Sequence, residues 1–197
     1  MKTRFTFLAI ITALVFSSCE QQVTENDNLI LSVNKSVQDD LFLLNKPNVS
    51  GNAKGQSVLN FRAHLSGDQE VPQRETKARG EAVFQLSKDG LELSYKIIVA
   101  NLDNISMAHI HVAPAGTNGP VVVWLYPPAP PAILKPGTTN GILQSGVISK
   151  ANLVGSLAGH ELSDLVDLMA NEGTYVNIHT SQFPGGEIRG QISGNVN

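Results

Sequence analysis

Three histidines lie on two predicted β-strands, and their spacing suits metal binding. His109 and His111 are two residues apart in the stretch Met107–Tyr126, so the alternation of side chains along a strand puts both on one face. His179 lies in a second predicted strand pair, Tyr175–Ile192. Three imidazole nitrogens form a ligand set that zinc and copper accept. The three histidines are therefore candidate ligands of a zinc or copper ion.

The C-terminal hairpin is predicted to carry further polar residues to the face of His179. An antiparallel register that keeps polar residues together pairs Asn177 with Arg189 and His179 with Glu187. A shift by one residue would mix polar and apolar side chains on both faces. In the favoured register, Glu187 is either a fourth ligand or the acceptor that orients the His179 ring.

Two other interpretations of the histidines stay open. In the first, the imidazoles hydrogen-bond loop backbones such as Ala113–Gly119 and hold the two hairpins together. In the second, they line a ligand groove without a metal, together with Asn177, Glu187 and Arg189.

Catalytic signatures are missing from the chain, and we expect no enzymatic activity. The sequence contains neither a Gly-x-Ser-x-Gly motif nor a phosphate-binding loop. A copper–zinc superoxide dismutase also has a His-x-His strand, but its binuclear centre needs more imidazoles. Here His64 and His160 have no neighbouring ligand pattern, and a single cysteine cannot form that family's disulfide. Asp68 and Glu70 fall in a predicted loop, where carboxylates are usually solvated.

The charge of the chain excludes one class of partner. Fourteen lysines and arginines against seventeen acidic residues give 14 − 17 = −3, and no basic block is present. Nucleic acid is therefore not an expected partner.

The N-terminus predicts a lipid-anchored protein outside the cytoplasm. Lys2 and Arg4 precede the apolar run Phe5–Phe16, which is too short for a comfortable membrane span. Ser17-Ser18-Cys19 follows and resembles the cleavage site of bacterial lipoprotein signals, whose cysteine receives fatty acyl chains such as palmitate. Residues 1–19 would then be the signal with lipidated Cys19. A plain secretory signal is the alternative.

The elements that position the histidines are predicted to be mainly strands. Residues 20–56 have the composition of a flexible tether, and the domain extends over residues 57–197. Asn101–Ser106 is expected to turn the chain into the histidine strand, and Val121–Tyr126 is expected to be a central buried strand. Pro127–Pro136 should be an exposed loop of unassigned role, because prolines lack backbone donors.

One helix is predicted before the last hairpin. Leu162, Leu165, Val166 and Met169 have helical spacing, and Gly173 can end the run. We expect an all-β domain of about eight strands with this single short helix inserted before the final strand pair.

The segments AHIHVAPAGTNGPVVVWL and YVNIHTSQFPGGEIRGQI resemble the two signature segments of the CHRD domain, which is named for its repeats in chordin. The resemblance covers roughly Val58–Ser193. It implies an extracytoplasmic, all-β module of the immunoglobulin-like sandwich or barrel kind, and it implies no established activity. His109, His111, Asn177 and His179 match the pattern, as does the stretch Gly-Glu-Ile-Arg-Gly that begins at Gly186.

These observations favour a module of the cell envelope, on its periplasmic or surface side, anchored to the membrane through Cys19. It would act in binding or adhesion toward a protein or carbohydrate, or as a structural module. The alternative is a copper- or zinc-binding module that uses His109, His111 and His179.

Overall fold

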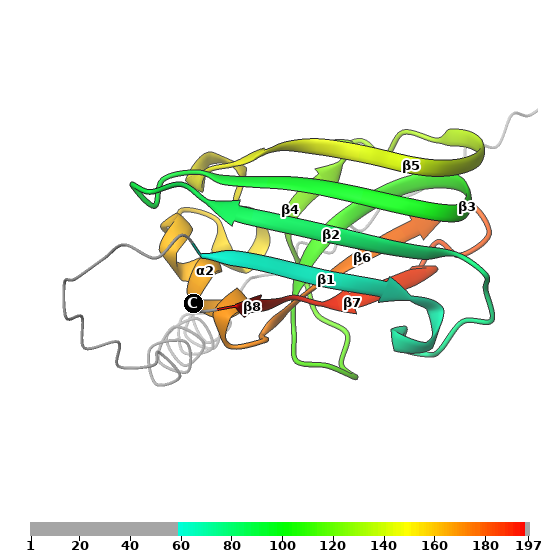
Figure 1. Ribbon diagram of the computed structural model, residues 1–197, viewed down its shortest axis with the longest axis horizontal. Helices are drawn as coiled ribbons and strands as arrows, with labels where there is room; N and C mark the ends of the chain where they lie inside the picture. The colour runs from blue at the N-terminus through cyan, green and yellow to red at the C-terminus, as the bar shows by residue number, and fades with distance from the viewer. Residues whose placement is uncertain (1–58, 196–197) are drawn as a thin grey trace, which may run out of the picture. The chain divides into compact units, whose positions relative to one another are not determined.

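The computed structural model describes residues 59–195, which form an all-β domain with one α-helix (Figure 1). The predicted signal, Cys19 and the tether lie outside the described residues. The strands are β1 (Asn60–Ser66), β2 (Arg79–Leu86), β3 (Leu93–Val112), β4 (Val121–Tyr126), β5 (Lys135–Ile148), β6 (Thr174–Thr180), β7 (Ile188–Gln191) and β8 (Ser193–Asn195). The all-β prediction is confirmed, as is the count of about eight strands among these residues.

Antiparallel pairing closes the sheet on itself. The strands follow the order β2-β1-β7-β6-β3-β4, and β2 also pairs with β3. This second pairing completes a ring, so the arrangement is barrel-like. β5 joins the ring through β3, and β8 joins it through β1. Alternating positions such as Phe61, Ala63 and Leu65 point into the core, while their neighbours on β1 are exposed or half-buried.

β3 belongs to both walls of this ring. Its first half pairs with β2 and β5, and its second half pairs with β6 and β4. The predicted turn at Asn101–Ser106 is wrong, because the strand continues through it. Asn101 and Asn104 adopt positive φ angles of 55° and 52°, a conformation that asparagine tolerates well. The two residues therefore redirect the strand without ending it.

β4 lies at the end of the sheet order, so the prediction of a central strand is wrong. It pairs along its length with β3, and its other edge meets an irregular segment through one bridge between Val123 and Leu153. The 3-10 turns Lys150–Asn152 and Gly155–Leu157 belong to this segment. This segment therefore occupies the edge of β4 that a second strand would otherwise pair with.

The predicted helix is α2 (Leu162–Ala170), which precedes the last hairpin as expected. Its four apolar residues at helical spacing are all buried: Leu162, Leu165, Val166 and Met169. At its start, Asp164 accepts a hydrogen bond from the backbone N–H of Glu161 at 3.2 Å. No helix of the described part of the chain is both long enough and apolar enough to cross a membrane.

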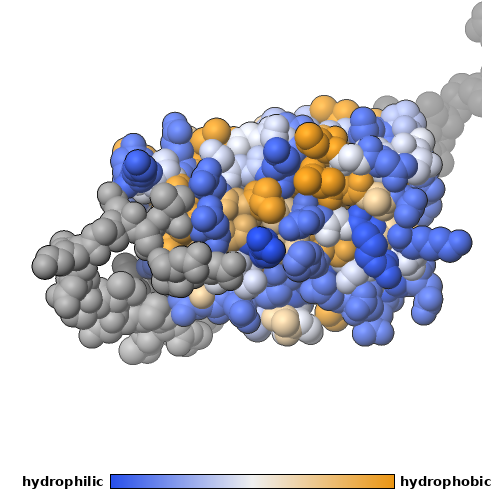
Figure 2. All heavy atoms as spheres, in the orientation of Figure 1, coloured by the Kyte–Doolittle hydropathy of each residue, from blue (hydrophilic) through white to orange (hydrophobic). Residues whose placement is uncertain are grey.

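The outer face of β3 and β5 carries exposed aliphatic side chains among polar ones (Figure 2). They are Ile98 on β3 and Ile142 and Val147 on β5. The proline-rich stretch is exposed from residue 128 to residue 136, as predicted, although Pro127 is buried and β5 already begins at Lys135.

Candidate metal centre

Strand register brings the three predicted histidines to one face of the β3–β6 pair. His109 lies opposite Asn177 and His111 opposite Tyr175, in an uninterrupted antiparallel register. His179 is two residues beyond Asn177, so it shares this face. The opposite face carries aliphatic residues such as Ile110 and Ile178, which are fully buried in the core.

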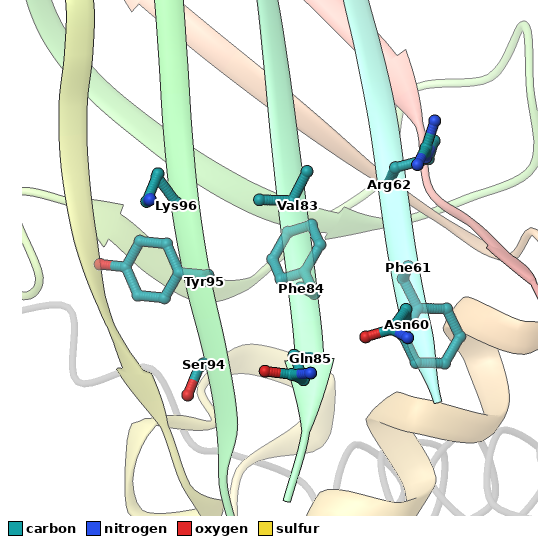
Figure 3. Close-up of a pocket in the computed structure, with 9 residues that line it drawn as sticks. All are labelled: Asn60, Phe61, Arg62, Val83, Phe84, Gln85, Ser94, Tyr95 and Lys96. Atoms are coloured by element: carbon teal, nitrogen blue, oxygen red, sulfur yellow. The ribbon is translucent and has the colours of Figure 1, made fainter. Parts of the chain in front are cut away.

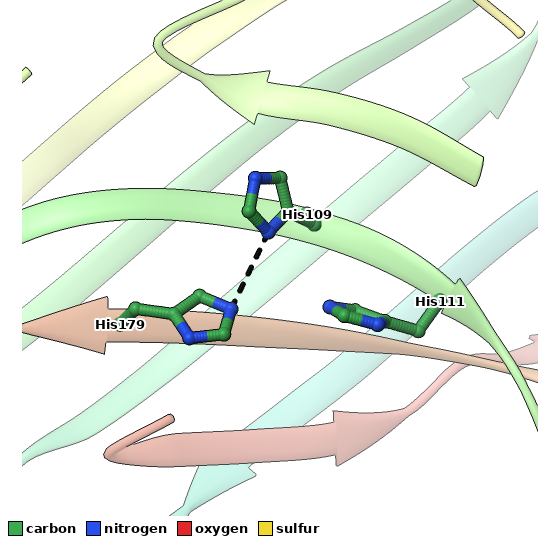
Figure 4. A group of neighbouring side chains, drawn as sticks. All are labelled: His109, His111 and His179. Atoms are coloured by element: carbon green, nitrogen blue, oxygen red, sulfur yellow. Dashed lines mark hydrogen bonds between the residues drawn. The ribbon is translucent and has the colours of Figure 1, made fainter. Parts of the chain in front are cut away.

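The three imidazoles are buried and converge (Figure 4). The exposed fractions of His109, His111 and His179 are 3%, 8% and 6%. One ligand nitrogen from each ring lies within 4.8 Å of the others. The shortest separation, 3.3 Å, joins Nδ1 of His109 to Nε2 of His179. The sequence prediction that these residues share one surface is confirmed by this geometry.

Backbone carbonyls fix which nitrogens face the shared space. Nδ1 of His111 lies 2.9 Å from the carbonyl oxygen of Gly119, and Nδ1 of His179 lies 2.9 Å from that of Pro184. Because a carbonyl can only accept, each of these two Nδ1 atoms must carry the proton. Nε2 of His179 is then an acceptor, and Nδ1 of His109 donates to it. Nε2 of His111 is buried and has no hydrogen-bond partner in the described part of the chain.

Burial keeps the rings neutral. Desolvation, followed by repulsion from the other two histidines, lowers the pKa of His109 from 6.5 to about 3. Desolvation also lowers the pKa of His111 to about 4 and depresses the pKa of His179. Each neutral imidazole keeps one lone pair of the kind that a metal requires. His109 would bind a metal through Nδ1 after the proton it donates to His179 moves to its own Nε2, which has no hydrogen-bond partner among the described residues.

Aromatic side chains enclose the cluster. The ring of His111 stacks on Tyr175, with centres 4.8 Å apart and planes 9° apart. The edge-to-face contact of Trp124 with His109 brings their ring centres to 4.3 Å. The tyrosine hydroxyl accepts a hydrogen bond from the backbone N–H of Gly119 at 3.1 Å. The rings thus have little freedom to reorient.

Arg189 lies next to the cluster and secures the loop between β3 and β4. Its register partner is Asn177, as predicted. The guanidinium donates to the carbonyl oxygens of Thr117 and Pro114 at 2.7 and 3.3 Å, and to Oδ1 of Asn118 at 3.2 Å. It also lies 3.4 Å from the centre of the Tyr175 ring. The guanidinium of Arg189 is therefore hydrogen-bonded to groups of the protein itself.

Glu187 does not orient His179, and that prediction is wrong. Its two carboxylate oxygens accept hydrogen bonds from the hydroxyls of Thr76 and Thr180, each at 2.7 Å. The carbonyl of Pro184 orients the His179 ring in its place. Glu187 instead ties the loop before β2 to the hairpin between β6 and β7.

Glu70 is a buried residue that the sequence reasoning missed. It was expected to be solvated, yet its exposed fraction is 4%, and the loop that carries it covers the polar face of β6. Desolvation raises its pKa from 4.5 to about 7, against the attraction of Arg189. Nδ2 of Asn177 lies 3.5 Å from one of its oxygens. A loop glutamate gives no sequence signal for such burial.

The other two histidines of the domain lie apart from the cluster. His64 is exposed on β1. Nδ1 of His160 lies 3.3 Å from Oδ2 of Asp164 at the start of α2.

Two hollows of the described surface differ in their distance from the polar face of the histidine hairpins. One of about 490 Å³ crosses β1, β2 and β3 (Figure 3), and its lining contains no histidine, cysteine or carboxylate. A second, of about 410 Å³, lies between the Asp68–Gln73 loop and the loop at Gly116, and Glu70 and Arg189 both border it. Only the second adjoins the polar face of the histidine hairpins.

The fold and this site define a barrel-like β domain with a buried three-imidazole cluster. A family model for the CHRD domain matches residues 61–192, and the chain therefore belongs to the CHRD-domain family. CHRD domains are typically extracellular, which agrees with an extracytoplasmic domain. Comparisons with curated proteins and with solved structures gave no significant match.

Proposed function

We propose that the domain binds one zinc or copper ion through His109, His111 and His179. The observation that carries this proposal is the convergence of three neutral, buried imidazoles whose nitrogens lie within 4.8 Å of one another. Two of the rings are oriented from behind by carbonyl oxygens, the arrangement in which metal-bound histidines are usually held. Nε2 of His111 would gain the partner it otherwise lacks.

The composition of the site favours binding over catalysis. Three imidazoles leave a coordination position open, but Glu187 is engaged by two threonines and Arg189 is engaged by loop carbonyls. Neither Glu187 nor Arg189 is therefore free to act as an acid or a base beside the rings. We propose a protein that stores, carries or senses a metal ion rather than an enzyme.

Metal analysis of the full chain tests this function. After chelator washing, the protein is loaded with zinc or copper and the bound metal is measured per chain. A Cys19→Ser background removes the thiol as a competing ligand. We expect about one ion per chain, lost in the His109→Ala/His111→Ala variant and retained in His64→Ala, whose histidine is exposed on β1. Equal metal content in the two variants, or none in the unaltered protein, would contradict the proposal.

The location proposed for this function is the outer side of a membrane, with Cys19 as the lipid attachment point. The support is the signal-like N-terminus together with a family whose domains are typically extracellular. Two or more acyl chains give stable anchoring, whereas one is marginal. We expect Cys19→Ser to move the protein from the membrane fraction to the soluble fraction. Retention of that variant in the membrane would rule out this anchor.

A second candidate function is the binding of a protein or carbohydrate ligand, as in an adhesion module. The hollow of about 410 Å³ bordered by Glu70 and Arg189 favours it. A chelator-treated protein that still retains a protein or carbohydrate ligand, with retention lost on filling the hollow by Ala115→Trp, would support this candidate over the metal site.

A further inference from the structure

Met107 shares the face of the three histidines. It precedes His109 by two residues on β3, and no irregularity of the β3–β6 register falls between Met107 and His111. Side chains two apart on a strand point the same way, so Met107 and His109 lie on one side. Across the strands, Met107 is the direct partner of His179. Side chains of such a pair start about 5 Å apart, well within the reach of a methionine.

Met107 lies at the partly open end of this strand face. It is half-buried, whereas His109 is buried. Methionine has three rotatable bonds and a thioether that adapts to irregular gaps. Its side chain can therefore change rotamer without a change in the backbone, as an approach of the sulfur to the rings would require.

The ligand set that results is electrically neutral. Neutral imidazoles and a thioether contribute no negative charge, so a bound ion keeps its full charge in a buried place. The solvation cost of burying an ion grows with the square of its charge, so a divalent ion costs about four times as much as a monovalent one. Arg189, which contacts the same Tyr175 ring as His111, adds repulsion to any cation. Both effects favour the ion of lower charge.

Thioether sulfur is a soft ligand that selects copper(I), while zinc and copper(II) are satisfied by imidazole. We propose that Met107 adds a sulfur ligand to the histidine cluster and makes copper(I) the preferred ion of this site. This inference rests on the proposed metal-binding function and deepens it. It gives the domain the role of holding a cuprous ion in the compartment outside the cytoplasm.

A comparison of two metals in one pair of variants tests this inference. Full-length chain in the Cys19→Ser background is titrated anaerobically with copper(I) against a chromogenic cuprous chelator. In parallel it is titrated with zinc against a zinc indicator. We expect Met107→Leu, which nearly conserves side-chain volume, to lower copper(I) affinity about tenfold or more, the scale typical of losing a partner at a metal site. Zinc affinity should stay within about twofold.

Two controls separate ligation from structure. Met169→Leu alters the buried methionine of α2 and should change neither affinity. Copper X-ray absorption should show sulfur scattering in the unaltered protein and not in Met107→Leu. Equal loss of both metals in Met107→Leu, or an unchanged copper(I) affinity, would overturn the role of Met107 while leaving the histidine site standing. Failure of the unaltered chain to bind either ion would overturn the proposed function itself.

Discussion

Side chains alternate between two faces in both halves of β3, but the outward-facing residues are exposed in the first half and buried in the second. In the first half, inward residues such as Tyr95 and Ile97 are buried and outward residues such as Lys96 are exposed. In the second half the inward residues are again buried, but the outward His109 and His111 are buried too. The difference comes from three loops that lie over the second half. They are the loop that contains Glu70, the turn that contains Pro184, and the loop between β3 and β4 that Arg189 holds. The two-residue alternation of a strand therefore determines which face a side chain occupies, and the covering loops determine whether that face is exposed to solvent.

The largest expected effect is the response of the covered half to acid. The folded pKa values of His109 and His111, about 3 and about 4, lie below the ordinary 6.5. Between about pH 6.5 and pH 4 the unfolded chain binds protons that the folded chain refuses, so stability falls as pH falls. Each histidine contributes up to about 1.4 kcal/mol per pH unit in this window.

Urea unfolding with chelator present, from pH 7 to pH 4, measures this slope. His109→Gln/His111→Gln should flatten it, whereas His64→Gln on exposed β1 should not. An equally steep slope in the double variant would show that the acid sensitivity arises elsewhere.

Releasing the loop that covers the second half of β3 should have the next largest effect on the free energy of unfolding. Arg189→Leu removes the donor shared by Thr117, Pro114 and Asn118, and leaves these acceptors of the covering loop unpaired. We expect a loss of about 3 kcal/mol in the free energy of unfolding, measured by urea denaturation. Arg62→Leu, on the uncovered face of β1, should stay within about 0.5 kcal/mol. Comparable losses in the two variants would mean that Arg189 does not support the loop.

The smallest predicted effect on the free energy of unfolding concerns Glu70, which is buried in its loop. A folded pKa of about 7 for Glu70, against 4.5, means that the unfolded chain ionises first as pH rises. Stability is then lost between about pH 4.5 and pH 7, the reverse of the histidine effect. Glu70→Gln should raise the free energy of unfolding at pH 8 by about 1–2 kcal/mol, while Glu92→Gln at an exposed site should not. A destabilised Glu70→Gln protein would argue that the ionised carboxylate is well paired.

Sequence patterns were sufficient where side-chain parity alone decides the outcome. The convergence of His109, His111 and His179 and the pairing of Asn177 with Arg189 follow from alternation and from the need to separate polar from apolar faces. The all-β class and the single helix before the last hairpin follow from the same periodicities.

Contacts between segments distant in the chain could not be predicted in this way. Glu187 meets Thr76, which is 111 residues away, and nothing local in either segment marks that pairing. The burial of Glu70 depends likewise on where its loop folds back. The edge position of β4 was missed because cover by an irregular segment produces the same apolar composition as cover by a second strand.

The length of β3 has a consequence for how the domain unfolds. Because β3 pairs with β2 and β5 at one end and with β4 and β6 at the other, disorder of β3 would remove hydrogen bonds from both walls at once. We therefore expect the described domain to unfold in a single cooperative event. The arrangement of the three histidine rings therefore persists as long as the domain stays folded.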